Sequence, residues 1–214
     1  AGINESASLV GAASPAANHK IVVPVFSSGE IFALRYENGS VAWAENLSSF
    51  RAIGNLESLS DIRGLPIIDK GLVIAISFGG KMIAIDERTG NRIWQREIGG
   101  SETPWIAGNN IFVISSDSEL ISLNRANGAI HWIKDLPRYE DPGDRDNPII
   151  WTGPIMAGGR LITLASNGDA MEISPNNGNI IRSWSVKRPV TISPIVSGGV
   201  LYILTDDGTL IAYK

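Results

Sequence analysis

The chain contains no cysteine in its 214 residues. This absence excludes disulfides, cysteine nucleophiles, zinc–thiolate sites and a lipid-bearing cysteine within this chain. No apolar run approaches the roughly 20 residues that a membrane-spanning helix needs, so the sequence predicts no transmembrane segment. The charge balance of 18 basic against 22 acidic residues lacks the basic excess that is typical of nucleic-acid-binding proteins, and we expect no nucleic-acid partner.

Residues and motifs typical of catalysis are equally scarce. The two histidines, His19 and His131, have no nucleophile or second ligand at a matching spacing. The sequence has no G-x-S-x-G elbow, no Walker loop and no H-E-x-x-H motif. We therefore predict no catalytic residues, no bound metal and no cofactor.

What the chain does contain is a repeat of fixed internal spacing. A proline is followed fourteen residues later by a small turn residue, and ten residues after that by a glycine. Five prolines begin the copies: Pro15, Pro66, Pro104, Pro154 and Pro194. The turn residues are Gly29, Gly80, Ser118, Gly168 and Gly208, and the later glycines are Gly39, Gly90, Gly128 and Gly178. Periods near 40 residues indicate propellers, solenoids or repeat arrays.

Each copy resembles a series of short strands. In the last copy, residues 200–205 and 209–213 are apolar runs rich in Ile, Leu and Tyr, separated by a turn that contains glycine. Such runs are too short for helices. A further strand with tryptophan follows the later glycine, and Trp43, Trp94 and Trp132 each stand four residues after it. In the fourth copy Arg182 occupies that position, and Trp184 follows two residues later on the same strand face.

These features predict an all-β protein, a β-propeller built from four-stranded antiparallel blades. We expect a single propeller array over residues 1–214, with blades at approximately 12–46, 64–98, 102–136, 152–187 and 191–214. Trp43, Trp94, Trp132 and Trp184 are interpreted as structural, since an indole buried between adjacent blades contributes roughly 2–3 kcal/mol. Stacking of a ligand on these indoles is the alternative interpretation.

Two connections between blades are long. They run from Trp43 to Pro66 and from Trp132 to Pro154. Repeat proteins place insertions on loops that often form one binding face, so both segments are candidates for contact with a partner. The second contains the acidic stretch 137–148. It is interpreted as a solvated, self-paired polar loop, with a calcium site as the alternative, although its spacing is not that of an EF-hand.

The segment Ala84–Trp94 reads A-I-D-E-R-T-G-N-R-I-W. It resembles the tryptophan-docking motif A-x-D-x-x-T-G-x-x-x-W of the quinoprotein-type (PQQ-like) eight-bladed propellers. The longer stretches 59–99 and 199–210 are similar to the propeller lipoprotein family of the outer-membrane β-barrel assembly machinery, the BAM complex. The resemblance covers essentially the whole chain, at the level of the C-terminal five blades of an eight-bladed ring.

This resemblance implies a non-enzymatic scaffold on the periplasmic face of the outer membrane. It implies a lipid anchor that is not present in this chain, and further blades, so that the chain is expected to be a fragment of a larger propeller. The implied partner is BamA, the barrel subunit of the machinery, with nascent outer-membrane proteins as a further candidate.

The resemblance also implies which residues contact BamA. In the family, one contact loop carries an S-L-R-G-like sequence; Ser8 and Leu9 match it here, and Val10 replaces the arginine. The other is an L-S-D-x-D-like segment, matched by Leu59, Ser60 and Asp61, with Arg63 in place of the second aspartate. The alternative for Asp61 is a turn or cap residue before the strand that follows Pro66.

Two other functions remain open from the sequence. A fragment of a quinone-dependent (PQQ) dehydrogenase would share the fold, but those enzymes usually need a paired-cysteine element, acidic ligands and a calcium ion. The chain has no cysteine and no evident ligand cluster. A periplasmic propeller adaptor with another partner is the third possibility.

Overall fold

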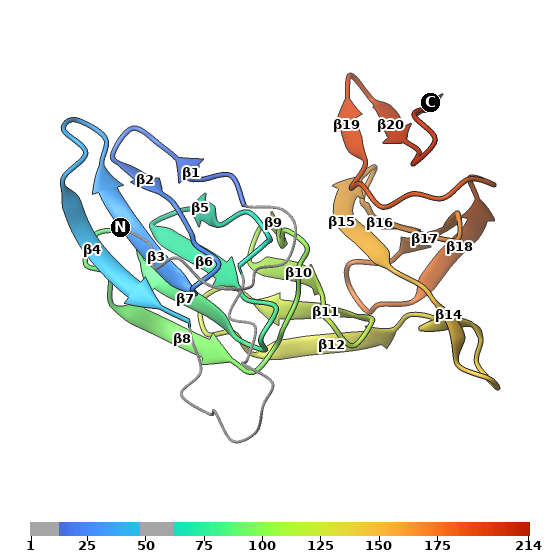
Figure 1. Cartoon of the computed structure of the whole chain (residues 1–214), viewed down its shortest axis with the longest axis horizontal. Helices are drawn as coiled ribbons and strands as arrows, with labels where there is room; N and C mark the ends of the chain where they lie inside the picture. The colour runs from blue at the N-terminus through green and yellow to red at the C-terminus, as the bar shows by residue number, and fades with distance from the viewer. Residues whose placement is uncertain (1–12, 48–61) are drawn as a thin grey trace. The chain divides into compact units, whose positions relative to one another are not determined.

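The structure, a computed structural model, describes residues 13–47 and 62–214, and every regular element in these ranges is a β-strand. The strands form four antiparallel sheets of four strands, one sheet of three strands and one two-stranded hairpin. Figure 1 shows each sheet as a meander whose strands follow one another along the chain. The predicted all-β architecture of four-stranded antiparallel blades is therefore confirmed.

The strands have the following bounds. The first sheet contains β1 (Ala16–Ala17), β2 (Ile21–Val23), β3 (Glu30–Arg35) and β4 (Val41–Asn46). The second contains β5 (Ile67–Asp69), β6 (Leu72–Ile76), β7 (Met82–Asp86) and β8 (Arg92–Arg96). The third contains β9 (Trp105–Ala107), β10 (Asn110–Ile114), β11 (Glu119–Asn124) and β12 (Ile130–Asp135). The hairpin pairs β13 (Tyr139–Asp141) with β14 (Asp146–Pro148). The fourth sheet contains β15 (Trp151–Ala157), β16 (Arg160–Ala165), β17 (Asp169–Ile173) and β18 (Ile180–Ser185), and the fifth contains β19 (Ile195–Ser197), β20 (Val200–Leu204) and β21 (Leu210–Tyr213).

The small residue of the repeat forms the turn between the second and third strands of each sheet. Its φ is positive in all five copies, including the one in which serine replaces glycine, Ser118 with φ 57°. Its N–H donates to the carbonyl oxygen three residues earlier, at 2.8 to 3.4 Å. Glycine is favoured here because it adopts positive φ without steric cost. The constant spacing in the sequence therefore reflects a constant turn.

A register shift occurs at the same place in all four complete sheets. The pairing of the third and fourth strands changes between Ala33 and Leu34 in the first sheet. The equivalent steps are 84–85, 122–123 and 172–173 in the other sheets. Such a bulge re-aims the side chains that follow it. It fixes which residue of the fourth strand faces the neighbouring turn.

Burial differs sharply between the strands of a sheet. The middle strands, such as β6 and β10, are almost continuously buried, whereas most residues of the outer strand β18 are exposed. Middle strands buried on both faces require cover on both sides of the sheet, as in a stack of blades.

The described chain divides into two compact units. One comprises residues up to Thr103 together with the turn 126–128, and the other comprises residues 104–125 and 129–214. The first contains a core cluster that includes Val23, Ile31 and Ile83. The second contains one cluster around Phe112 and another around Leu164.

Two details differ from the sequence-based expectation. Pro154 does not precede the first strand of its sheet but lies inside β15, where the pairing with β16 shifts between Thr152 and Ile155. The shift removes the need for a donor at the proline. The exposed stretch 137–148 contains the β13–β14 hairpin, a pair of regular strands that the interpretation as a polar loop did not include. Asp141 accepts hydrogen bonds from the N–H groups of Gly143 and Asp144 at 2.8 and 3.4 Å.

Candidate functional site

Most of the contact residues that the resemblance implies lie outside the described residues. This applies to Ser8, Leu9, Val10, Leu59, Ser60 and Asp61. Arg63 is described and is half-buried just before β5. The segment after it is tightly packed: a Cβ on Gly64 would lie 2.6 Å from the carbonyl oxygen of Glu102, and the N–H of Leu65 donates to Thr103 Oγ1 at 3.0 Å. Arg63 is therefore presented from an anchored stretch of chain.

The blade tryptophans contact a turn of a neighbouring sheet. Nε1 of Trp43 donates to the carbonyl oxygen of Glu87 at 2.8 Å, and Nε1 of Trp132 donates to that of Pro175 at 3.0 Å. In both cases the acceptor stands three residues before the later glycine of the repeat. That glycine lies against the indole: a Cβ on Gly90 would lie 2.6 Å from Trp43, and one on Gly178 would lie 2.8 Å from Trp132. The turn and the tryptophan thus fit only when the turn carries glycine.

Arg96 binds the corresponding turn of residues 126–128. Its Nε donates to the carbonyl oxygen of Gly128 at 2.6 Å, and its Nη2 donates to that of Asn127 at 2.8 Å. Trp94, two residues before Arg96 on β8, packs on the same glycine, since a Cβ there would lie 2.7 Å from the indole. On this strand the tryptophan packs on the glycine of the turn, and the arginine holds the turn through two of its backbone carbonyls.

The fourth sheet replaces this arrangement with a charged pair. Trp43, Trp94 and Trp132 pair across the strands with the small residues Ala33, Ala84 and Ser122. Each of these small residues stands eighteen residues after the proline that begins its copy of the repeat. In the fourth sheet that position is Glu172, and it pairs with Arg182. Trp184 pairs instead with Ala170. The tryptophan and its small partner are displaced by two residues along the strands, and the vacated position holds Arg and Glu.

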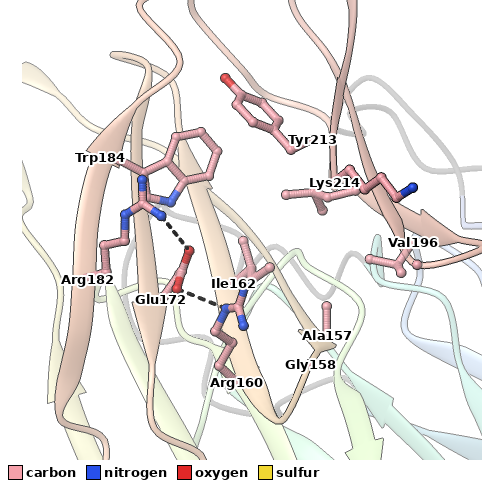
Figure 2. A pocket seen from close by; sticks show the side chains of 12 residues that line it. Ala157, Gly158, Arg160, Ile162, Glu172, Arg182, Trp184, Val196, Tyr213 and Lys214 are labelled. Carbon is pink, nitrogen blue, oxygen red and sulfur yellow. Dashed lines mark ion pairs between the residues drawn. The ribbon is translucent and has the colours of Figure 1, made fainter.

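A pocket of about 330 Å³ lies beside this pair, between the fourth and fifth sheets. Figure 2 shows Trp184, Arg182 and Glu172 on one wall, Arg160 below them, and Tyr213 and Lys214 across the pocket. Glu172 Oε2 lies 2.9 Å from Arg160 Nε, and Glu172 Oε1 lies 4.0 Å from Arg182 Nη1. The glutamate side chain is only 11% exposed and that of Arg182 is 66% exposed. One buried carboxylate therefore faces two guanidinium groups, and the nearer contact belongs to Arg160.

The indole ring of Trp184 packs edge-on against Tyr213 of the fifth sheet, with ring centroids 4.9 Å apart. The sequence signalled this site through Arg182 at the tryptophan position, but Glu172 and Arg160 were missed because nothing in their local sequence marks them as a pair.

A larger groove of about 600 Å³ lies in the other unit, lined by residues that include His19, Arg35 and Arg88. It borders the turn that holds Trp43. Asn18 donates to the buried carboxylate of Glu87 there at 2.7 Å. The indole N–H of Trp43 beside this groove is bound to the carbonyl oxygen of Glu87.

The clearly shifted pKa values belong to aspartates in turns. Hydrogen bonds from the side chain and the N–H of Thr89 lower the pKa of Asp86 below its usual value of 3.8. Hydrogen bonds from Thr205 and then Thr209 lower the pKa of Asp207 to about 2. Both causes are local turn contacts, so these shifts indicate capped turns.

In residues 13–47 and 62–214, no cluster of three or more histidine or acidic side chains is arranged to hold a metal ion. Within the same residues, no helix is long and apolar enough to cross a membrane.

Comparison with known proteins identifies a matching family and relatives in sequence. Residues 2–134 match the family described as outer membrane protein assembly factor BamB. The factor of that name from Alkalilimnicola ehrlichii is 28% identical over 207 residues, which covers 96% of this chain and 52% of the relative. The chain thus spans about half the length of the curated relatives it matches.

Solved structures show the same fold. BamB from Moraxella catarrhalis superposes with a TM-score of 0.83 at 22% identity, covering 98% of this chain and 60% of that chain. A quinohemoprotein alcohol dehydrogenase from Pseudomonas putida superposes with a TM-score of 0.61 at 17% identity, covering 82% of this chain and 34% of that chain. At these identities the likeness concerns the fold alone. The predicted PQQ-like β-propeller fold and the resemblance noted in the sequence are both confirmed.

Proposed function

The chain belongs to the family of the outer membrane protein assembly factor BamB, and from this membership we propose that it is a non-enzymatic binding scaffold of the barrel assembly machinery. The family match carries the proposal because it includes both segments that the sequence assigned to partner contact, around Leu9 and around Asp61. The relatives are named as assembly factors and not as enzymes.

We place the scaffold on the periplasmic face of the outer membrane. Its proposed partner is a BamA-like barrel subunit, contacted through residues 8–10, 59–61 and Arg63. Of these residues Arg63 is described, and the contacts of Gly64 and Leu65 beside it anchor that stretch of chain, which lowers the entropy lost when a partner binds there. Nascent outer-membrane proteins are a further proposed partner, because an extended strand can pair with an exposed sheet edge through backbone hydrogen bonds alone.

A pull-down with the purified BamA-like subunit of the same organism tests the proposal. We expect the chain to retain the subunit, and the double variant Leu9→Ala, Asp61→Ala to weaken binding about tenfold or more, as loss of two contact side chains would. Leu210→Ala and Asp144→Ala are matched controls at exposed positions of the described structure, and we expect no effect from them.

The outcomes separate the function from the site. Failure of the unmodified chain to retain the subunit would overturn the proposed function. Retention by the double variant at full strength would overturn only the assignment of these residues.

A further inference from the structure

We propose that Leu65 and Phe78 form an apolar contact patch beside Arg63, and that apolar side chains of the BamA-like subunit cover this patch. The proposal rests on the proposed function, because it names further residues of the same partner surface. Both residues lie in the compact unit that includes the chain up to Thr103.

Phe78 departs from the repeat at a turn position. Twelve residues after the proline, the other four copies carry serine or aspartate: Ser27, Ser116, Ser166 and Asp206. Short polar residues favour turns because their side chains can bond to nearby backbone groups, and phenylalanine offers no such bond. Phe78 is nevertheless 37% exposed. The turn between β6 and β7 therefore does not explain why this copy carries a large apolar side chain.

Leu65 departs from the repeat in the same copy. The residue before the proline is small or polar in the other copies: Ser14, Thr103, Gly153 and Ser193. Leu65 is 42% exposed, and it contacts Thr103 Oγ1 through its backbone N–H, which nearly every residue type could supply. Two template positions thus change from small or polar to large and apolar. Both changes fall in the copy that follows the segment 59–61.

One short connection, residues 99–103, anchors both positions. At its start, a Cβ on Gly99 would lie 2.8 Å from the carbonyl oxygen of Phe78, so the connection passes directly against that turn. At its end, Thr103 accepts the hydrogen bond from Leu65 at 3.0 Å. Because the backbone at both apolar residues is already fixed, covering them would order little further chain.

The patch has the chemistry of a protein interface. Aromatic residues and arginine are enriched at such interfaces, and a few buried anchors carry most of the binding energy. Arg63 stands two residues before Leu65 and belongs to the proposed contact with the BamA-like subunit. A partner that reaches Arg63 therefore also meets Leu65, and this continuity favours that subunit as the occupant.

The repeat itself supplies substitutions that suit the fold. Phe78→Ser gives this turn the residue that three other copies carry there, and Leu65→Thr copies the residue before Pro104. The affinity of the full chain for the purified BamA-like subunit is measured by isothermal titration calorimetry. We expect Phe78→Ser to weaken binding about tenfold or more and Leu65→Thr about threefold or more, because each removes apolar area that the partner buries. Ile93→Thr, at an exposed position of β8, is the control and should leave the affinity unchanged.

A second measurement detects the contact directly. The chain has no cysteine, so Leu65→Cys, Phe78→Cys and Ile93→Cys each provide a single attachment point for a benzophenone label. At saturating subunit, we expect illumination to cross-link the subunit to labels at positions 65 and 78 and not at position 93. A substitution that only loosened the fold would weaken binding without placing a label beside the subunit.

The outcomes distinguish this proposal from the proposed function. If the unmodified chain does not bind the subunit, both are overturned. If it binds, and both Phe78→Ser and Leu65→Thr bind equally well, only the patch is overturned. Cross-links between two copies of the chain without subunit, together with a solution mass that falls on Phe78→Ser, would assign the patch to self-association and also overturn the proposal.

Discussion

The contact between a tryptophan and a turn glycine predicts a large and specific loss of stability on Gly90→Ala. Gly90 has φ +75°, and a Cβ there would lie 2.6 Å from both Cβ and Cγ of Trp43. Carbon atoms at optimal contact stand about 3.5–4.0 Å apart, so the overlap is about 1 Å. Trp43 is only 7% exposed and its N–H is bound to Glu87, so the indole has little freedom to move.

Two terms contribute to the loss. Alanine in the left-handed region costs about 1–2 kcal/mol, and forced overlap in a packed site typically costs about 1–3 kcal/mol. We therefore expect Gly90→Ala to lower the free energy of unfolding by about 2–5 kcal/mol. Gly39→Ala is the matched control, because Gly39 has the same place in its turn and φ +71°, yet no atom lies within 4 Å of its added Cβ. It should cost only the first term.

The assay is urea unfolding of the two variants followed by far-ultraviolet circular dichroism. Both glycines belong to the same compact unit, so both report on the same structure. Equal losses in the two variants would refute the reasoning, because only the tryptophan contact distinguishes them. In a Trp43→Gly background, which removes Cβ together with the indole, Gly90→Ala should fall to the cost of the control, a non-additivity that a double-mutant cycle measures.

Three further predictions concern polar contacts. Thr89→Val should raise the pKa of Asp86 toward 3.8, as measured by NMR titration. Because the folded pKa is depressed, the hydrogen bond stabilises the turn above pH 3.8, and its contribution is lost as the pH falls through the folded value, so the stabilities of variant and parent should converge in acid. Arg96→Met should lower the free energy of unfolding by about 1.5–3 kcal/mol, measured by urea unfolding. Arg96→Lys should restore less than half of that loss, since lysine lacks the fork that reaches two carbonyls, and full restoration by lysine would contradict the geometry. Glu172→Gln should lower the free energy of unfolding by about 1–3 kcal/mol, measured as a lower unfolding midpoint, because two arginines lose their shared counter-charge. Added salt should reduce this loss, and an unchanged midpoint at low salt would show that the ion pairs contribute nothing.

Much of the fold follows from local rules. Gly29 and its equivalents stand in turns that need positive φ, and such a need is visible in a single sequence because it depends only on the backbone of that turn. The short apolar runs between the turns could form little except strands. The position of Pro154 inside β15 was not foreseen, because a bulge depends on the pairing with β16 and not on the proline alone.

The site was less accessible from the sequence. Arg182 was visible as a departure from the tryptophan position, yet its consequence depends on Glu172 across the strand and on Arg160 from β16. Charged residues on alternate positions of short strands look alike in the sequence, whether they meet solvent or one another. The hairpin formed by β13 and β14 was missed for a related reason, since its acidic residues gave no apolar alternation to indicate strands.

The sequence by itself determined the repeat, the strand count of each blade, the family and the residues that frame the contacts, because each depends on spacing along the chain. Only the tertiary structure decided which backbone group each of these tryptophans binds. Trp43 and Trp132 find a carbonyl 44 and 43 residues further along the chain. Whether a donor is satisfied depends on atoms brought together by packing, and no local pattern contains that information.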